Sequence, residues 1–130
     1  MDGRKYETVE HYFQSRKART GEDAKLIASA SSPREAKRLG RRIKIRGNWE
    51  QVKLDVMEKG VHAKFQQHPE LARKLVATGD VLLEEGNRWG DTFWGVDSRT
   101  GIGGNNLGKI LMLVREELKK IYCQQGATNT

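Results

Sequence analysis

Apolar residues recur at helical spacing through most of this sequence, and this pattern limits the chain to a mainly helical fold. The clearest case runs from Leu107 to Ile121, where Leu, Ile and Val return every three or four positions and share one helix face. No apolar run approaches the roughly 20 residues of a membrane-spanning helix. The 130 residues suffice for one modest hydrophobic core. We therefore expect a single domain over residues 1–130.

Capping signals place the helix boundaries. Thr8 can cap a helix through Arg19, because its side-chain oxygen can accept from an amide of the first turn. Ser32, Pro33 and Glu35 form a capping box that begins a helix ending near Gly40. The other helices are expected over Glu22–Ala30, Asn48 to His68, Pro69–Ala77 and Leu107–Gln124, followed by a frayed tail at residues 126–130.

Two short apolar runs, Val81–Glu84 and Phe93–Val96, predict short strands separated by a loop at Gly86–Thr92. Ser98–Asn106 is expected to be a long polar loop. Arg41–Arg46 alternates basic and β-branched residues, and fits either an edge strand or an extended connector. The expected fold class is therefore α+β, mostly α-helical, with a few short strands.

The positive charge is concentrated in the first third of the chain. Of 24 basic and 17 acidic residues, 13 and 6 respectively fall in residues 1–47, and Arg34–Arg46 alone holds seven basic residues and one acidic residue. Such density favours nucleic acid or a phosphate-bearing ligand. A solvated basic face is an equally good interpretation of composition alone.

Several classes of chemistry find no support. Cys123 is the one cysteine, so no internal disulfide can form, and a cytoplasmic protein without a signal peptide is expected. His11, His62 and His68 lack the spacing of a metal site with Cys123, so no metal is expected. No GxSxG motif supports a serine nucleophile.

The loop GIGGNNLG, Gly101–Gly108, ends where a helix begins. Glycines let backbone amides approach an anion and a helix N-terminus adds partial positive charge, so this loop can hold phosphate. The alternative is a flexible connection in which Gly108 permits close helix packing.

The segment EEGNRWGDTFWGVD, Glu84–Asp97, mixes two tryptophans with four carboxylates. Buried carboxylates need partners, so a pocket wall explains this mixture better than a core segment does. Tryptophan can stack on a base, and a carboxylate can stabilise positive charge at an anomeric carbon. Alternatively, Trp89 and Trp94 are core anchors and the acids are caps and solvated turns.

Glu10 lies in TVEHYFQ, flanked by residues that are expected to be buried. An unpaired carboxylate there would have a raised pKa, which is typical of functional sites. The alternative is a glutamate that stabilises the first turn of a helix.

Five motifs in order resemble the NADAR family, the YbiA-like N-glycosidases. They are TVEHYFQ at Thr8–Gln14, SPREAKRLGR at Ser32–Arg41, Val52–Asp80, EGNRWGDTFWG at Glu85–Gly95 and GGNNLGKILMLVR at Gly103–Arg115. The resemblance is colinear over roughly residues 5–120. Family members usually carry a further segment before TVEHYFQ, including a strand, and only seven residues precede the motif here. We therefore expect that strand to be missing.

The resemblance implies a mostly helical α+β hydrolase of N-glycosidic bonds that needs no metal or redox cofactor. The implied substrates are phosphorylated ribosylamino intermediates of riboflavin synthesis, or ADP-ribose attached to guanine in nucleic acid. Positions that match the family's pocket are the acids Glu10, Glu85 and Asp91 and the substrate-binding residues Lys17, Lys37, Asn87, Trp89, Trp94, Gly103 and Asn105.

The hypothesis is that Asp91 or Glu10 stabilises an oxocarbenium-like sugar while Trp94 or Trp89 stacks on the base. Phosphate would rest on Lys37, nearby arginines and the Gly103–Asn106 amides. The alternative is a module that binds ADP-ribose or nucleic acid without turnover. Neither the oligomeric state nor any membrane association is indicated.

Overall fold

The computed structural model describes residues 5–128, and the side chains of residues 5–122. The side chain of Cys123 and residues 129–130 of the expected frayed tail therefore lie outside the described part. Residues 126–128 of that tail are helical, so the prediction of fraying is wrong for them. The chain consists of two compact units, and the boundary between them in the sequence lies between Lys64 and Phe65. Each unit is described by itself. The expectation of one domain over residues 1–130 stays a prediction.

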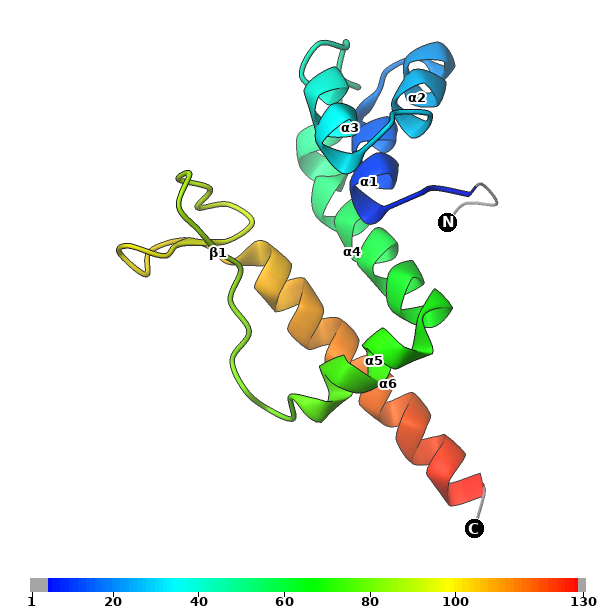
Figure 1. Ribbon diagram of the computed structural model, residues 1–130, viewed down its shortest axis with the longest axis vertical. Coiled ribbons are helices and arrows are strands. Elements are labelled where there is room, and N and C mark those ends of the chain that lie inside the picture. Colours follow the sequence, from blue (N-terminus) through cyan, green and yellow to red (C-terminus); the bar gives the residue numbers. More distant parts are fainter. Residues whose placement is uncertain (1–4, 129–130) are drawn as a thin grey trace. The chain divides into compact units, whose positions relative to one another are not determined.

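The first unit is built from helices. Figure 1 shows α1, α2 and α3 grouped together in blue and cyan, and α1 packs against both α2 and α3. Thr8 and Ser32 cap α1 and α3 as the sequence predicts, accepting from the amides of His11 at 3.1 Å and Glu35 at 3.0 Å. The helices are α1 (Val9–Lys17), α2 (Gly21–Ala28), α3 (Pro33–Gly40) and α4 (Trp49–Gln67), whose last residues belong to the second unit.

The core of this unit forms around α1. Tyr12 and Phe13 are buried, and the Phe13 ring lies 5.0 Å from that of Trp49 on α4. Gly60 on α4 faces Tyr12 so closely that an added Cβ would lie 3.1 Å from the ring. His11 is completely buried, where Nε2 donates to the Ala30 carbonyl at 2.9 Å and Nδ1 accepts from the Thr8 hydroxyl at 2.7 Å. This histidine is therefore a structural residue that ties α1 to the end of α2.

Arg41–Arg46 is a connector with a single antiparallel bridge, between Ala18 and Ile45. The amide of Arg19 donates to the Lys44 carbonyl at 3.0 Å, and that of Arg46 donates to the Lys17 carbonyl at 3.1 Å. These bonds hold the basic connector against the C-terminal end of α1.

The second unit combines two helices with a polar loop region. Buried Val114 and Leu118 on α6 and Leu75 on α5 provide its apolar core. Its elements are α5 (Pro69–Ala77), β1 (Gly86–Asn87), β2 (Val96–Asp97) and α6 (Asn106–Thr128). Helix α6 therefore ends four residues beyond the predicted Gln124.

Both predicted strands are wrong in position. Val81–Glu84 is irregular, with Val81 63% and Leu82 65% exposed, and the strand lies instead at Gly86–Asn87, inside the predicted loop. The second strand begins at Val96 rather than Phe93. The two strands pair in parallel over two residues each, and the buried side chain of Asn87 donates to the Val96 carbonyl across the pair at 3.3 Å. A polar side chain, which an apolar pattern does not mark, therefore helps to fix their position. The α+β, mostly α-helical class is confirmed, with six helices among residues 5–128.

Arg115 on α6 is a buried charge that sequence reasoning missed. It is 3% exposed, and its Nη1 donates to the Thr78 hydroxyl at 2.9 Å and to the Val81 carbonyl at 2.8 Å. The guanidinium thus holds the irregular segment that follows α5, where the sequence predicted a strand. In the described part of the chain, no helix combines the length and apolar character needed to cross a membrane.

Candidate functional site

Three polar side chains share one face of α1. Glu10, Gln14 and Lys17 follow one another at intervals of four and three residues, which places them in a row along the helix. Glu10 and Lys17 are half-buried, and Gln14 is only 6% exposed. Tyr12 and Phe13 of the same motif are buried in the core. Their burial fixes the rotation of α1 about its axis, and with it the direction of the row formed by Glu10, Gln14 and Lys17.

Gln14 holds the carboxylate of Glu10. Its Nε2 donates to Glu10 Oε1 at 3.3 Å, while its Oε1 is buried with no hydrogen-bond partner in the described part of the chain. That oxygen lies over Gly40, the last residue of α3, where an added Cβ would be 2.0 Å from it. The glycine therefore leaves the room that the amide needs to face Glu10.

Lys17 has a perturbed titration. Burial and then the positive charge of Arg41 lower its pKa below the ordinary value of 10.5, with a smaller contribution from Lys53, while Glu10 and Glu50 act in the opposite direction. A lysine that carries its proton less firmly in a half-buried setting is typical of functional sites. The sequence indicated Glu10 by its apolar neighbours and by the resemblance, and Lys17 by the resemblance alone. It did not indicate Gln14 or Arg41, although both lie inside motifs that carry the resemblance.

Lys37 lies on α3 and is exposed. The charges that act on Lys17 include Arg41, which caps the C-terminus of the same helix, but not Lys37. A phosphate contact by Lys37 stays a prediction.

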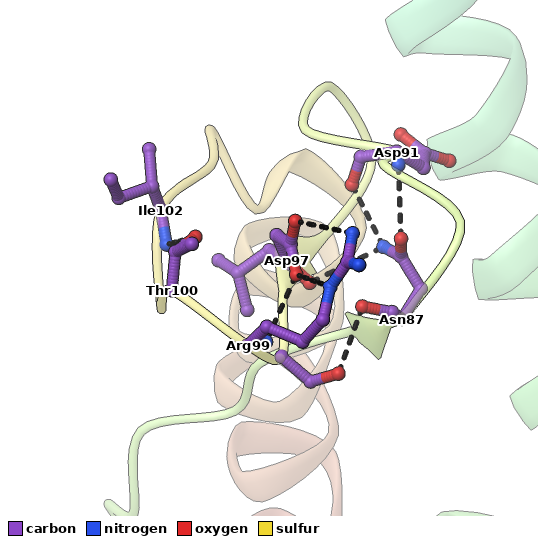
Figure 2. Close-up of polar contacts among 8 residues, drawn as sticks. Asn87, Asp91, Asp97, Arg99, Thr100 and Ile102 are labelled. Carbon is purple, nitrogen blue, oxygen red and sulfur yellow. Dashed lines mark hydrogen bonds and ion pairs between the residues drawn. The ribbon is translucent and has the colours of Figure 1, made fainter.

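In the second unit, Asn87 is the centre of a hydrogen-bonded loop (Figure 2). Its side chain is 3% exposed, accepts from the Asp91 amide at 2.9 Å, and donates to the carbonyls of Asp91 at 2.8 Å and Val96 at 3.3 Å. The Asn87 carbonyl in turn accepts from the Ser98 hydroxyl at 2.9 Å. Every polar group of this side chain thus has a structural partner.

Asp91 organises the next turn. Its Oδ1 accepts from the amides of Phe93 at 3.1 Å and Trp94 at 2.9 Å, a turn in which a side chain substitutes for a backbone acceptor. Asp97 does the same for Arg99, whose guanidinium also pairs with it in Figure 2 and lowers the pKa of that carboxyl. These acids therefore build the loop, as the alternative interpretation of the segment proposed.

Asn105 closes the region from the other side. Its Oδ1 accepts from the Glu85 amide at 2.9 Å and its Nδ2 donates to the Leu83 carbonyl at 2.8 Å, with the side chain 8% exposed. Its backbone has a φ of 52°, which asparagine tolerates better than most residues. Half-buried Glu85 is held by both backbone groups, since its carbonyl accepts from Val96 at 2.8 Å.

The predicted phosphate cradle at Gly103–Asn106 is wrong for three of its amides. Those of Gly104, Asn105 and Asn106 donate to the backbone carbonyls of Thr92 at 2.7 Å, Gly95 at 3.2 Å and Phe93 at 3.1 Å. Gly103 is required by the same close approach, because an added Cβ would lie 2.3 Å from the Gly95 carbonyl. These three amides already donate to carbonyls of the Thr92–Gly95 loop, so they cannot also bind an anion.

The two tryptophans differ in exposure. Trp89 is 73% exposed, and Trp94 is half-buried with its ring 4.8 Å from Phe93 in an edge-on contact. Trp89 is therefore no core anchor, and a role in stacking stays a prediction for both.

The predicted site residues thus fall into two groups, one in each unit. Glu10 and Lys17 share a face of α1 in the first unit. In the second, Glu85, Asn87, Asp91, Trp94, Gly103 and Asn105 belong to one hydrogen-bonded loop region. Within the described residues, no three His, Cys, Asp or Glu side chains come together as a possible metal site.

Several known proteins are similar to this chain in sequence. N-glycosidase YbiA of Escherichia coli is 45% identical over 120 residues, covering 91% of this chain and 74% of that protein. An N-glycosidase of Nostoc punctiforme is 41% identical over 124 residues, covering 92% of this chain and 78% of that protein. The maize riboflavin biosynthesis protein PYRR is 38% identical over 124 residues, covering 85% of this chain but 19% of that protein.

The solved structure of E. coli YbiA is similar to this one, with a TM-score of 0.85 and 41% identity over 95% of this chain and 73% of that one. A family model described as the NADAR domain matches residues 1–119. The resemblance that the five motifs indicate is thereby confirmed, and this chain belongs to the NADAR domain family.

Proposed function

We propose that this protein is a hydrolase that cleaves the N-glycosidic bond of a phosphorylated ribose compound. The observation that carries the proposal is the row on α1, where the carboxylate of Glu10 and the amine of Lys17, with its lowered pKa, lie on one helix face. The names of the YbiA and Nostoc relatives, both N-glycosidases, support the reaction class. The maize relative's name supports a riboflavin-pathway substrate.

Cleavage breaks the bond between the anomeric carbon and the base nitrogen, and the departing nitrogen keeps the electron pair. The sugar then carries positive charge until water adds to it and loses a proton to the carboxylate of Glu10. In our proposal the carboxylate of Glu10 faces that charge and orients the water. Lys17, whose pKa is lowered, gives its proton to the leaving nitrogen more readily than an ordinary lysine does.

We assign the main catalytic role to Glu10 rather than Asp91. The Oδ1 atom of Asp91 accepts hydrogen bonds from the backbone amides of Phe93 and Trp94. By contrast, the one hydrogen bond described for the Glu10 carboxylate comes from the side chain of Gln14 on the same helix face. Glu85 is a second candidate acid, because the residue is half-buried and Asn105 holds its backbone amide in place.

The test is product analysis with purified protein. Ribosylaminopyrimidine phosphates and DNA that carries ADP-ribose on guanine are incubated separately, and the products are identified by mass spectrometry. Release of the free base or amine together with the free sugar phosphate supports the proposal. Saturable binding without release would instead establish a binding module, the alternative that the sequence left open.

Glu10→Gln is expected to lower the rate about 10²- to 10⁴-fold, the usual contribution of a positioned acid or base. Glu22→Gln is the matched control, because Glu22 also lies in the first turn of a helix but is exposed. If a folded Glu10→Gln protein released product as fast as the parent, the assignment of Glu10 would be wrong.

A further inference from the structure

The irregular segment between α5 and β1 is hydrogen-bonded along one edge (Figure 1). The Asn105 side chain donates to the Leu83 carbonyl at 2.8 Å and accepts from the Glu85 amide at 2.9 Å. One residue of a parallel strand makes the same two contacts, so this side chain takes the place of a neighbouring strand. Two residues before Leu83, the Val81 carbonyl accepts from Arg115 at 2.8 Å. Val81, Leu83 and Glu85 thus direct backbone groups to the same edge.

This alternation continues into β1. The carbonyls of Glu85 and Asn87 accept from the amides of Val96 and Ser98, each at 2.8 Å. Gly86 lies between them and is level with Val96 in the parallel pair. Successive residues of an extended strand direct their backbone groups to opposite edges, so those of Gly86 point away from β2.

The opposite edge, formed by the backbone groups of Leu82, Glu84 and Gly86, is open. All three residues are exposed, Leu82 by 65%. Among residues 5–128, neither Leu82 nor Glu84 takes part in a hydrogen bond. An exposed row of unpaired amides and carbonyls is a template for one more strand. The segment therefore has the sequence of a strand and lacks a second strand to pair with.

The side chain of Glu84 disfavours a second copy of this chain as that strand. Two copies related by a two-fold axis would pair antiparallel, and pairing over the whole open edge would place Glu84 opposite Glu84 of the second copy. Like charges directly opposite one another destabilise a strand pair, and a charged side chain on an edge is a usual protection against self-association.

The same side chain selects a partner of opposite charge. Glu84 has no ion pair within the part of the chain that the structure describes. Leu82 lies two residues away, so both side chains are on one face of the strand. An added strand fits this face when it places lysine or arginine opposite Glu84 and an apolar residue opposite Leu82.

We propose that the open edge binds an extended strand of a partner protein, in which a basic residue faces Glu84 and an apolar residue faces Leu82. Backbone hydrogen bonds supply the binding, and the two side chains fix the register. Every contact that carries this proposal lies in the second unit, so the proposal does not depend on the chemistry assigned to α1.

The experiment measures binding of a fluorescent, end-capped peptide to the full chain by anisotropy. The peptide has lysine at its centre, valine two residues to either side and threonine elsewhere, so it fits the edge in either direction. Its control carries N-methyl groups on the amides that would face the protein, which keeps every side chain and charge but removes the donors. The parent should bind the first peptide and not the second. Equal binding of both, or binding of neither, would overturn the proposal.

Two variants at one position test the backbone and the charge. Glu84→Pro removes an amide of the open edge but leaves the bonds of Leu83 and Glu85, so it should weaken binding at least tenfold with little change in melting temperature. Glu84→Lys should weaken binding of the lysine peptide about fivefold and favour a glutamate-centred peptide instead. Asp55→Lys, the same charge change at an exposed position on α4, is the matched control. An equal loss in that control would overturn the proposal, because general charge would explain binding.

Amide hydrogen exchange locates the bound strand. Exchange at Leu82 and Glu84 should slow when the peptide binds, whereas the Glu85 amide, already bonded to Asn105, should not change. Peptide binding without this protection would overturn the proposal. Protection without peptide that rises with protein concentration would assign the edge to a second copy and overturn it as well. Glu10→Gln should bind the peptide like the parent, so failure of the proposed hydrolase activity would leave these results unchanged.

Discussion

The polar residues of α1 and those of the Gly86–Asn106 region both combine carboxylates with side-chain amides, but the two regions use them in opposite ways. On α1, Gln14 and Lys17 lie on one helix face, where burial and the charge of Arg41 lower the pKa of the lysine. In the loop region, the amides of Asn87 and Asn105 and one oxygen of Asp91 are consumed by backbone partners. A helix satisfies its own backbone, so its side chains are left for chemistry, whereas an irregular loop needs its side chains to satisfy its backbone.

The largest effect expected from this comparison separates two acids. Glu10→Gln should lower the hydrolysis rate about 10²- to 10⁴-fold, while Asp91→Asn should retain most of it, because the asparagine oxygen still accepts from the amides of Phe93 and Trp94. Rates are compared on proteins whose circular dichroism matches the parent. A loss with Asp91→Asn as large as that with Glu10→Gln would return Asp91 to the chemistry.

Gly103→Ala should destabilise the loop region by about 3 kcal/mol or more, because the new Cβ meets backbone rather than a movable side chain. Gly47→Ala is the control, since nothing lies within 4 Å of the Cβ added there. Urea unfolding measures the two free energies. Similar values for both variants would contradict the close approach of Gly103 to Gly95.

Asn105→Ala should lower the free energy of unfolding by about 1–3 kcal/mol, because it leaves the groups of Leu83 and Glu85 without their partner. Asn106→Ala should cost less, since Asn106 makes one exposed bond, to the Phe93 carbonyl at 2.8 Å, which water can replace. Thermal unfolding ranks the pair. The reverse order would show that Asn105 is not the structural residue of the two.

Gly40→Ala should leave the fold nearly intact but lower activity about tenfold, an effect near 1.4 kcal/mol. The methyl group pushes the Gln14 amide from its position, and Glu10 then loses the hydrogen bond that orients it. Steady-state kinetics should show the change in kcat with a shifted pH profile. Gln14→Leu should reproduce that shift, and an unaltered profile in both would assign Gln14 to packing alone.

The smallest effect concerns the pH dependence of stability. The pKa of Lys17 in the folded protein lies below the ordinary 10.5, so the unfolded chain binds this proton more tightly than the folded one does. The protonated lysine therefore lowers the free energy of unfolding, and this loss of stability is fully present at neutral pH. Lys17→Met should therefore raise the melting temperature at neutral pH, and the advantage should shrink as pH rises through the folded pKa toward 10.5. Lys37→Met, at an exposed position, is the control and should show no such trend.

Much of the helical frame could be predicted from local signals. Thr8 and Ser32 cap their helices as expected, and Pro69–Ala77 begins and ends at the predicted residues. Glu10 was identified from its apolar neighbours and from the resemblance to a family, and Lys17 from the resemblance alone. Gln14 and Arg41 were missed because their importance comes from Gly40 and from burial, which neighbours in sequence do not reveal.

The sequence by itself determined the helices, the α+β class and the family, because caps, prolines and helical periodicity act over a few residues. Only the tertiary structure decided what Asn87 and Asn105 do. The partners of their side chains lie 4 to 22 residues away, and the glycine-rich amides meet a loop ten or more residues earlier. Hydrogen bonds between distant segments form only once the chain has folded, so the composition of a loop cannot tell whether its polar groups serve a ligand or the loop itself.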